Sequence, residues 1–363
     1  MGVGRFIVNT GSKVADYCAF GLQNRHYWHL FNRDLGNFEG ANDQLSEKYK
    51  KEIDDLWKRR YNLKVDKRWF AHYKHCYGEE SPYYIPDNVF HSLIEPYFNR
   101  DEYSKCMVNK NYFEKWLPNI KHVVTLIRNI NNVWYDQGFN VLTPNKVVEK
   151  LSAYSEFVAK PAIDSAGGAG VRFIAEKMDL KKLDELKSSF NNDFIIQEVF
   201  KQHECLNKIY PSSVNTIRTI TLNWNGEVHV LSSVLRMGVN GSRVDNMVSG
   251  GVNCAIHSDG TLSNKLYNAR GSLFEGHPNS GNMDDKKIEN FDAVVKTACE
   301  SHKQLPYMGI ISWDFALNEK AEPVLIEFNV KPQGIDLHQR ENGPLFGDMT
   351  VKVLDEVFAK RIK

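Results

Sequence analysis

The hydrophobic positions of the chain follow a helical spacing in its first third. Leu45, Tyr49 and Ile53 recur every four positions among Lys, Glu and Asp residues, which predicts an amphipathic helix over residues 44–61. Aromatic residues are concentrated in the same third, and we expect them to pack in a core, because aromatic side chains dominate core burial. Residues 1–105 are therefore expected to form a mostly helical N-terminal region.

The pattern changes near residue 156, where short runs of β-forming residues begin. Residues 156–161 and 171–174 predict two strands, and a loop of small residues lies between them. A helix is expected at residues 180–190 and another strand at 194–200. This hairpin, helix and strand would make a unit small enough to be a lid.

Strands also dominate from residue 214 onward. Residues 215–222 and 227–236 flank an Asn-Gly dipeptide that strongly favours a hairpin turn. Helices are expected at residues 291–303 and 347–361. We therefore predict an α+β fold in three parts: a helical region over 1–105, a linker helix and lid subdomain over 106–200, and a catalytic C-terminal subdomain over 201–363.

A late hairpin carries the most informative polar residues. Residues 313–317 and 324–330 predict two strands around a polar turn. Glu327 and Asn329 then share one face, because side chains two positions apart on a strand point the same way, and Asp314 can lie across from them. Two carboxylates and an amide oxygen suit a hard cation such as Mg²⁺, which usually shares its coordination with phosphates and water. An ordinary amphipathic hairpin with solvated acids is the alternative.

Composition limits the classes of function. The 363 residues include 42% hydrophobic and 25% charged positions, as expected of a globular protein of two or three domains. A net charge of +1 argues against strong attraction to nucleic acid or to a membrane surface. No run approaches the ~18 apolar residues of a spanning helix, and no signal-peptide pattern occurs at the N-terminus. The six cysteines are scattered without a CxxC pair, which favours reduced thiols and a cytoplasmic location.

The loop of small residues has a definite chemical use. Ser165, Gly167, Gly168 and Gly170 would let backbone N–H groups approach phosphate oxygens, and Lys160 on the preceding strand can reach the same phosphates. The segment lacks the GK[ST] of a P-loop. A plain flexible turn is the alternative.

The strand after the expected helix can contact a nucleoside. Gln197, Glu198 and Val199 can offer backbone groups to an adenine edge, and Glu204 can accept hydrogen bonds from ribose hydroxyls. A solvated strand is the alternative for Glu198.

Two arginines on later strands are further candidates. Arg218 and Arg236 lie beside polar residues, and a guanidinium on the inner face of a sheet needs a carboxylate or phosphate partner. A catalytic role and a structural salt bridge are both open. The histidines show no zinc-binding spacing, and no serine lies in a GxSxG elbow.

The order of these pieces resembles the ATP-grasp superfamily, which includes D-alanine–D-alanine ligase. A lysine precedes a Gly-rich hairpin, a Gln-Glu strand follows, and an acid and a Glu-x-Asn pair lie on late neighbouring strands. The resemblance implies a fold in which two α+β subdomains grip ATP. It also implies Mg²⁺, with Mn²⁺ as an alternative, held by Asp314, Glu327 and Asn329 against the ATP phosphates.

The resemblance extends to the nucleotide contacts. It places Lys160 at the α-phosphate, the loop from Ser165 to Gly170 over the phosphates, Glu198 and Val199 at the adenine, and Glu204 at the ribose. A second, earlier lysine is expected, and Lys110 and Lys115 are the candidates, of which Lys110 looks closer. Lys160, Arg218 and Arg236 would stabilise charge that develops during the reaction.

Three motifs are similar, more narrowly, to the sugar-transfer-associated ATP-grasp group, which is often linked to surface-polysaccharide loci. They are residues 211–218, residues 236–238, and residues 244–246 followed by Gly250-Gly251. The similarity covers roughly residues 105–350. The N-terminal third departs from the α/β domain that usually precedes the ATP-grasp fold and often helps to build the acceptor site.

The resemblance implies an ADP-forming ligase that joins a carboxylate to an amine through an acyl-phosphate. Its partners would be small-molecule carboxylate and amine substrates, with sugar-linked compounds and amino acids among the options. One alternative is a kinase that phosphorylates a sugar-like hydroxyl, and another is a nucleotide- or glycan-binding protein without catalysis. We expect no nucleic-acid partner and no membrane span, and the sequence leaves the substrates and the oligomeric state open.

Overall fold

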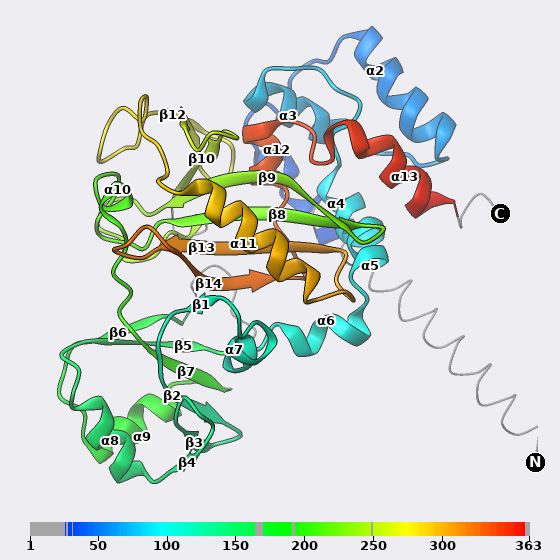
Figure 1. The fold of residues 1–363 in the computed structure, drawn as a ribbon. Helices are drawn as coiled ribbons and strands as arrows, with labels where there is room; N and C mark the ends of the chain where they lie inside the picture. The colour runs from blue at the N-terminus through cyan, green and yellow to red at the C-terminus, as the bar shows by residue number, and fades with distance from the viewer. Residues whose placement is uncertain are drawn as a thin grey trace, which may run out of the picture. The chain divides into compact units, whose positions relative to one another are not determined.

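The computed structural model describes residues 26, 28–30, 32–163, 170–190, 193–247 and 250–359. The chain forms two compact units, whose elements are labelled in Figure 1. Residues 1–100, 270–272 and 331–363 make the first unit, and residues 101–269 and 273–330 make the second. The three-part division predicted from the sequence stays a prediction.

Helices build the first unit. α2 (Glu47–Ile53) continues directly into the π-helical segment η2 (Asp54–Arg60), so the predicted helix over residues 44–61 is confirmed, with a change of hydrogen-bond pattern midway. Ser46 caps α2 by accepting a hydrogen bond from the backbone N–H of Tyr49. The other helical segments are η1 (Leu35–Asn37), α3 (Arg68–Tyr77), α4 (Asp87–Val89), the π-helical η3 (Phe90–Ile94), α5 (Glu95–Phe98), α12 (Asp336–Asn342), η6 (Gly347–Met349) and α13 (Thr350–Phe358).

Aromatic side chains form the core of this unit, as the sequence predicts. Trp57, Trp69 and Tyr73 are almost completely buried. Tyr73 stacks on both Trp69 and Tyr84, with ring centroids 5.9 and 5.2 Å apart. These rings bury large apolar areas, which favours a packing role over a ligand-stacking role.

A buried polar cluster lies inside the same unit. Asp87 accepts a short hydrogen bond from the Tyr73 hydroxyl. Nearby, His91 Nδ1 is 3.1 Å from Glu95 Oε2, and both side chains are buried. Burial, reinforced by the negative charge of Asp336, raises the pKa of Asp87 to about 7. This carboxyl therefore favours its protonated form much more than a solvated aspartate does.

An eight-stranded sheet is the centre of the second unit in the described part of the chain. Its strand order is β1-β14-β13-β8-β9-β10-β11-β12, and only β1 and β14 pair in parallel. The helix predicted at residues 291–303 is α11 (Phe291–Lys303), which packs across one face of the sheet (Figure 1). The strands are β1 (Lys121–His122), β8 (Thr216–Trp224), β9 (Glu227–Met237), β10 (Val252–Ile256), β11 (Leu262–Tyr267), β12 (Leu273–Glu275), β13 (Ile310–Leu317) and β14 (Pro323–Asn329).

Side-chain alternation along β13 separates the core from the opposite face of this sheet. Trp313 and Phe315 pack in the core that α11 covers. Asp314 lies between them, so its side chain points to the other face.

A β-bulge in β14 adjusts which residues face the core. Leu325 and Phe328 both belong to that core, although they are three positions apart. The register with β13 shifts at this point and leaves Ile326 as the extra residue of β14. Glu327 consequently faces the same side of the sheet as Asp314.

A second sheet of the described chain has six antiparallel strands in the order β4-β3-β2-β7-β5-β6. Helices α8 (Pro144–Leu151) and α9 (Leu180–Ser188) pack against it through a small apolar core. The strands are β2 (Thr125–Ile130), β3 (Val133–Tyr135), β4 (Val141–Leu142), β5 (Phe157–Pro161), β6 (Arg172–Ile174) and β7 (Phe194–Glu198). The sequence predicted β5, β6, β7 and α9, but it missed β2, β3 and β4.

A local signal for the missed hairpin is present in the sequence. Asn131 and Asn132, between β2 and β3, have φ angles of +49° and +66°. Consecutive left-handed residues are the mark of a tight hairpin turn, and asparagine tolerates them well.

Three short helices link the units and strands: α6 (Asp101–Met107), α7 (Phe113–Trp116) and α10 (Glu204–Asn207), with the 3-10 turn η4 (Lys110–Tyr112) before α7. Within the described ranges, no helix has the length and apolar character needed to cross a membrane. Among the described residues, the cysteines at 76, 106, 205, 254 and 299 form no disulfide, and Cys18 lies outside the described residues.

Candidate functional site

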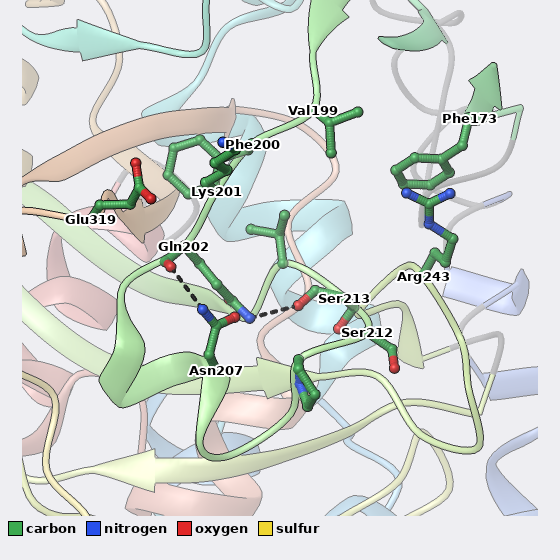
Figure 2. Close-up of a pocket in the computed structure, with 12 residues that line it drawn as sticks. Phe173, Val199, Phe200, Lys201, Gln202, Asn207, Ser212, Ser213, Arg243 and Glu319 are labelled. Atoms are coloured by element: carbon green, nitrogen blue, oxygen red, sulfur yellow. Dashed lines mark hydrogen bonds between the residues drawn. The ribbon is translucent and has the colours of Figure 1, made fainter. Parts of the chain in front are cut away.

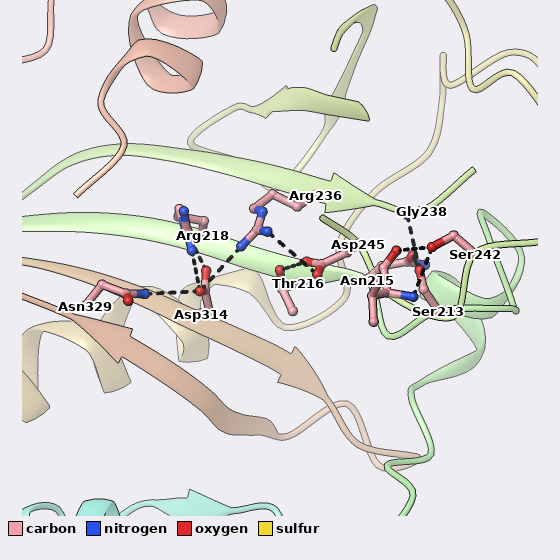
Figure 3. Close-up of polar contacts among 11 residues, drawn as sticks. Ser213, Asn215, Thr216, Arg218, Arg236, Gly238, Ser242, Asp245, Asp314 and Asn329 are labelled. Atoms are coloured by element: carbon pink, nitrogen blue, oxygen red, sulfur yellow. Dashed lines mark hydrogen bonds and ion pairs between the residues drawn. The ribbon is translucent and has the colours of Figure 1, made fainter. Parts of the chain in front are cut away.

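Three neighbouring strands place polar residues in a row on the face of the eight-stranded sheet opposite α11 (Figure 3). Arg218 of β8 lies directly across from Asp314 of β13. Asp314 in turn lies directly across from Glu327 of β14. Asn329, two positions after Glu327, shares their face. We call these four residues the charged row. The predicted hairpin therefore does bring its two acids and its amide together.

Arg218 and Asp314 form a close, two-pronged ion pair. Nε and Nη2 of Arg218 donate to the two carboxylate oxygens of Asp314 at 2.7 and 2.5 Å. Burial lowers the pKa of Arg218, but the negative charge and hydrogen bonds of Asp314 outweigh it and raise that pKa above its ordinary value. The guanidinium stays charged and neutralises the buried carboxylate.

Arg236 holds its partners more loosely. Its Nη1 is 3.5 Å from Asp314 Oδ2, and its Nη2 is 3.7 Å from Asp245 Oδ1. Its buried Nε has no hydrogen-bond partner. Asp245 also accepts a short hydrogen bond from the Thr216 hydroxyl. Burial raises the pKa of the Asp245 carboxyl, although the positive charge of Arg236 opposes this shift.

Two lysines approach the other end of the charged row. Lys110 Nζ lies 2.8 Å from Glu327 Oε1, and the backbone N–H of Lys110 donates to the carbonyl of Ala162 beyond β5. Burial and the positive charge of Lys110 lower the pKa of Lys160 to about 8, while Glu327 opposes the shift. Two ammonium groups are thus held close enough to repel each other, an arrangement that an incoming polyanion would relieve.

Lys115, the other candidate for the second lysine, lies elsewhere. Its Nζ sits 3.8 Å from the centroid of the Phe139 ring, a cation–π contact, and Arg128 lies over the same ring at 4.6 Å. The geometry therefore favours Lys110 as the lysine that accompanies Lys160.

The donor set of the charged row fits a hard cation. Asp314, Glu327 and Asn329 supply oxygen atoms on one face, and Asn329 lies close enough for its amide nitrogen to be 3.5 Å from Asp314 Oδ2. Within the described residues, no group of three or more His, Cys, Asp or Glu side chains could hold a metal ion. A cation on this set would need further oxygens from phosphates or water, as Mg²⁺ commonly does.

A cavity of about 320 Å³ lies along the chain that follows β7 (Figure 2). Val199 and the next three residues line one wall, and residues 211–214 line another. Gln202 fixes the second wall, because its side-chain amide donates to the carbonyls of Tyr210 and Ser213 at 3.0 and 2.9 Å. Phe173, Asn207, Arg243 and Glu319 complete the lining.

The predicted nucleoside residues are only partly gathered at this cavity. Val199 lines it, whereas Gln197, Glu198 and Glu204 are not among its lining residues. Gln197 Nε2 donates to the carbonyl of Val123 at 3.3 Å. Glu204 forms an exposed ion pair of 2.8 Å with Lys208, a partner four positions along the chain.

The Gly-rich loop is described only at its end. Ser165, Gly167 and Gly168 lie outside the described residues. Gly170 has φ +79°, and a Cβ atom there would lie 2.9 Å from Pro161 Cγ. A side chain at this position would therefore be strained by the backbone and crowded by β5.

Sequence reasoning missed the roles of Thr216 and Asp245 beside Arg236. Antiparallel pairing puts Thr216 directly across from Arg236, a long-range relationship that a single strand pattern does not contain. The signal for Asp245 in the sequence is the Val-Asp-Asn motif at residues 244–246. The motif supports the family resemblance, but it does not by itself indicate a contact with Arg236.

A family model described as sugar-transfer associated ATP-grasp matches residues 90–350, which is most of the chain. The chain belongs to the sugar-transfer associated ATP-grasp family. The matched range contains the charged row, both lysines and the cavity. Family membership and the α+β fold class confirm what the resemblance implied.

Solved ATP-grasp ligases are distantly similar to this family member. The L-amino acid ligase from Bacillus licheniformis is 16% identical at a TM-score of 0.40, with 70% of this chain and 48% of that chain covered. D-alanyl-alanine synthetase A from Vibrio cholerae is 12% identical at 0.42, covering 70% and 65%. The VanG D-Ala:D-Ser ligase from Enterococcus faecalis is 14% identical at 0.43, covering 71% and 63%. The chain thus spans about half to two thirds of each of these proteins. No curated protein sequence matches it significantly.

Proposed function

We propose that this ATP-grasp protein is an ATP-dependent ligase that joins a carboxylate to an amine. The observation that carries the proposal is the meeting of the charged row with Lys110 and Lys160. Oxygen donors for a cation and ammonium donors for phosphates lie side by side. Lys110 joins the two sets, because its ammonium contacts Glu327 and its charge acts on Lys160. Few ligands other than a metal-bound polyphosphate would satisfy both halves of this arrangement.

Asp314, Glu327 and Asn329 would hold Mg²⁺, and Mn²⁺ could take its place. When bound, the ion would neutralise charge on the ATP phosphates. Lys160 and Lys110 would bind phosphate oxygens, the loop from Ser165 to Gly170 would cover them, and the cavity beside Val199 would receive the nucleoside. Glu198 and Glu204 stay predicted contacts of the adenine and the ribose.

The proposed reaction has two steps. A substrate carboxylate oxygen attacks the γ-phosphorus of ATP, and the bond from that phosphorus to the β–γ bridging oxygen breaks. ADP departs, and the substrate becomes an acyl-phosphate. An amine nitrogen then attacks the acyl carbon, loses one proton, and inorganic phosphate leaves, which yields an amide. Negative charge grows on oxygen atoms in both steps, and Lys160, Arg218 and Arg236 offer fixed cationic groups to stabilise it.

The six-stranded sheet would also exclude water from the site. An acyl-phosphate hydrolyses readily, so a ligase of this kind benefits from a cover that closes before the first step. We assign this task to the six-stranded sheet, which carries Lys160 on β5. The proposed substrates are small carboxylates and amines, sugar-linked ones included, in surface-polysaccharide or conjugate synthesis in the cytoplasm.

Trapping with hydroxylamine tests the proposal. The protein is incubated with ATP, Mg²⁺, hydroxylamine and a panel of sugar acids and amino acids, and ADP and products are followed by mass detection. A ligase gives a hydroxamate of its acid, whereas a kinase for a sugar hydroxyl gives a stable phosphoester and would overturn the ligase assignment.

Substitution of the metal site gives the matched test. Glu327→Ala should abolish ATP turnover, because it removes one of the two carboxylates of the charged row. Glu322→Ala is the control, since Glu322 lies in the same hairpin and its carboxylate pairs with exposed Lys121 at 3.1 Å. Full turnover by a folded Glu327→Ala protein would reject the metal assignment.

A further inference from the structure

The described part of the loop between β9 and β10, residues 238–247 and 250–251, contacts the six-stranded sheet through Arg243. The terminal nitrogens of Arg243 donate to the two carboxylate oxygens of Glu156 at 2.6 and 3.1 Å. The guanidinium carbon also lies 3.6 Å from the centroid of the Phe173 ring (Figure 2). Glu156 directly precedes β5, and Phe173 lies in β6, so this β9–β10 loop holds the edge pair of strands of that sheet.

Two positions further along, the same loop contacts Arg236, which in turn lies beside the charged row. Asp245 accepts from Thr216 and lies beside Arg236, whose other terminal nitrogen faces Asp314 (Figure 3). Continuous contacts therefore run from the six-stranded sheet through Arg243 and Asp245 to Arg236, and from Arg236 to the Asp314 carboxylate.

The backbone between these two loop residues is firmly held. Ser242 Oγ donates to the carbonyl of Val244 at 2.7 Å and accepts from its N–H at 3.2 Å. The Tyr210 hydroxyl donates to the carbonyl of Ser242 at 3.2 Å. At the start of the loop, a Cβ atom on Gly238 would lie only 2.8 Å from the Val244 carbonyl. These contacts restrain the backbone on both sides of Arg243, which favours a joint displacement of Arg243 and Asp245.

Arg236 is the residue of the site best able to respond to such a movement. Its contacts with carboxylates are 3.5 and 3.7 Å long, whereas Arg218 holds Asp314 at 2.5 and 2.7 Å. Its Nε is buried without a hydrogen-bond partner. A buried guanidinium with unused donors is positioned by the balance of its neighbours, so a small displacement of Asp245 changes where it points.

We propose that Asp245 is a positioning residue for Arg236 and that Arg243 ties the position of Asp245 to the six-stranded sheet. Closure of that sheet over a nucleotide triphosphate then sets the Arg236 guanidinium toward the transferred phosphoryl group. This inference rests on the proposed function, because it requires a Mg²⁺–nucleotide between the two sheets.

Hydrogen–deuterium exchange with the full chain and Mg²⁺–AMPPNP, a non-hydrolysable ATP analogue, tests the link to the sheet. In the wild type, the nucleotide should slow exchange in residues 233–247 at least five-fold. In Glu156→Gln the nucleotide should still bind, but this slowing should fall below two-fold, because the loop has lost its charged hold on the sheet.

A matched control and a rescue guard against a merely structural effect. Glu176→Gln removes a carboxylate that also lies beside the six-stranded sheet, where it pairs with Lys182 at 2.6 Å, and it should leave the slowing unchanged. The double exchange Glu156→Arg with Arg243→Glu should restore at least half of the slowing.

Arginine Nε–H resonances report on Arg236 directly. The signal of Arg236, assigned by its loss in Arg236→Lys, should move when Mg²⁺–AMPPNP binds the wild type. In Asp245→Asn this movement should fall by at least half, and Asp245→Glu should recover part of it.

The outcomes separate the two proposals. A wild type that binds no Mg²⁺–AMPPNP overturns the proposed function and this inference with it. A wild type that binds the nucleotide overturns this inference alone if Glu156→Gln keeps full slowing in the β9–β10 loop. The same holds if Asp245→Asn leaves the movement of the Arg236 signal intact.

Discussion

The ammonium group of Lys110 lies 2.8 Å from the carboxylate of Glu327. Lys110 precedes both sheets in the chain, whereas Glu327 lies in the late hairpin, so the pair joins distant parts of the second unit. In the proposed function, Glu327 gains a cation and Lys110 gains phosphate oxygens when a nucleotide binds. The opposite charges of the two side chains therefore offset each other until a metal ion and a phosphate would take their places.

The first prediction separates the two candidate lysines. Lys110→Ala should weaken the binding of Mg²⁺–AMPPNP at least ten-fold, measured by isothermal titration calorimetry, because one phosphate contact is lost. Lys115→Ala should change it less than two-fold, since its ammonium lies over the Phe139 ring. The reverse order of effects would move the second phosphate contact to Lys115.

The second prediction concerns pH. Burial and Lys110 lower the pKa of Lys160 to about 8, so its charge is present below that pH and is lost as the pH rises through it. Wild-type affinity for Mg²⁺–AMPPNP should therefore fall about ten-fold for each pH unit well above 8, in the absence of other titrating groups. Lys160→Arg keeps its charge throughout this range.

Titration calorimetry between pH 7.5 and 9.5, which brackets the pKa of about 8, measures the effect. The Lys160→Arg protein should show a much flatter profile than the wild type. Parallel profiles for the two proteins would mean that another group titrates and that Lys160 does not contact the phosphates.

The third prediction concerns stability. Arg218→Ala leaves the Asp314 carboxylate, only 4% exposed, without its close partner. The free energy of unfolding in urea should fall by about 3–5 kcal/mol without Mg²⁺, as when one member of a buried ion pair is removed. Lys121→Ala is the control, because its pair with Glu322 is exposed and should contribute less than about 1 kcal/mol.

Added Mg²⁺ extends this test to the metal site. It should stabilise folded Arg218→Ala more than the wild type, because Arg218 no longer competes for Asp314. Equal effects of Mg²⁺ on the two proteins would argue against metal binding at this carboxylate.

The fourth prediction addresses the buried polar cluster of the first unit. The pKa of Asp87 is raised to about 7, above the ~3.9 of an unfolded aspartate, so folding favours its protonated form. This stabilisation is complete at pH values below the unfolded pKa and is lost as the pH rises toward and through 7. Unfolding free energy should fall across that range by an amount on the order of 2–4 kcal/mol from this group.

Asp87→Asn is the comparison for that measurement. It keeps a polar group of similar shape but cannot ionise, so urea denaturation from pH 5 to 8 should lose most of this slope. A slope as steep as that of the wild type would place the titrating group elsewhere in the chain.

Local patterns predicted much of the second unit, and long-range pairing decided the rest. The spacing of Glu327 and Asn329 on one strand was enough to place them together, because strand alternation is a local property. The partnership of Arg218 with Asp314 depends on β8 lying beside β13, which no local run of residues specifies. The role of Asp245 was missed for the same reason, since its contact with Arg236 depends on how a loop folds back.

The choice between Lys110 and Lys115 shows the same limit. Both lie in one short helical stretch, and the sequence alone could only favour Lys110 by likeness to a pattern. The fold separates them, because one faces Glu327 and the other faces Phe139. Their difference is a matter of which side of a turn each occupies.

The extra residue Ile326 determines which side chains of the hairpin β13–β14 face the core. If β14 paired regularly through Ile326 instead, Leu325 and Phe328, which are three positions apart, would face opposite sides of the sheet. With Leu325 kept in the core, Glu327 would then turn inward and Phe328 outward, although every chemical group of the site would still be in the protein. One unpaired aliphatic residue thus decides which chemical groups this centre presents, although it carries no polar group itself.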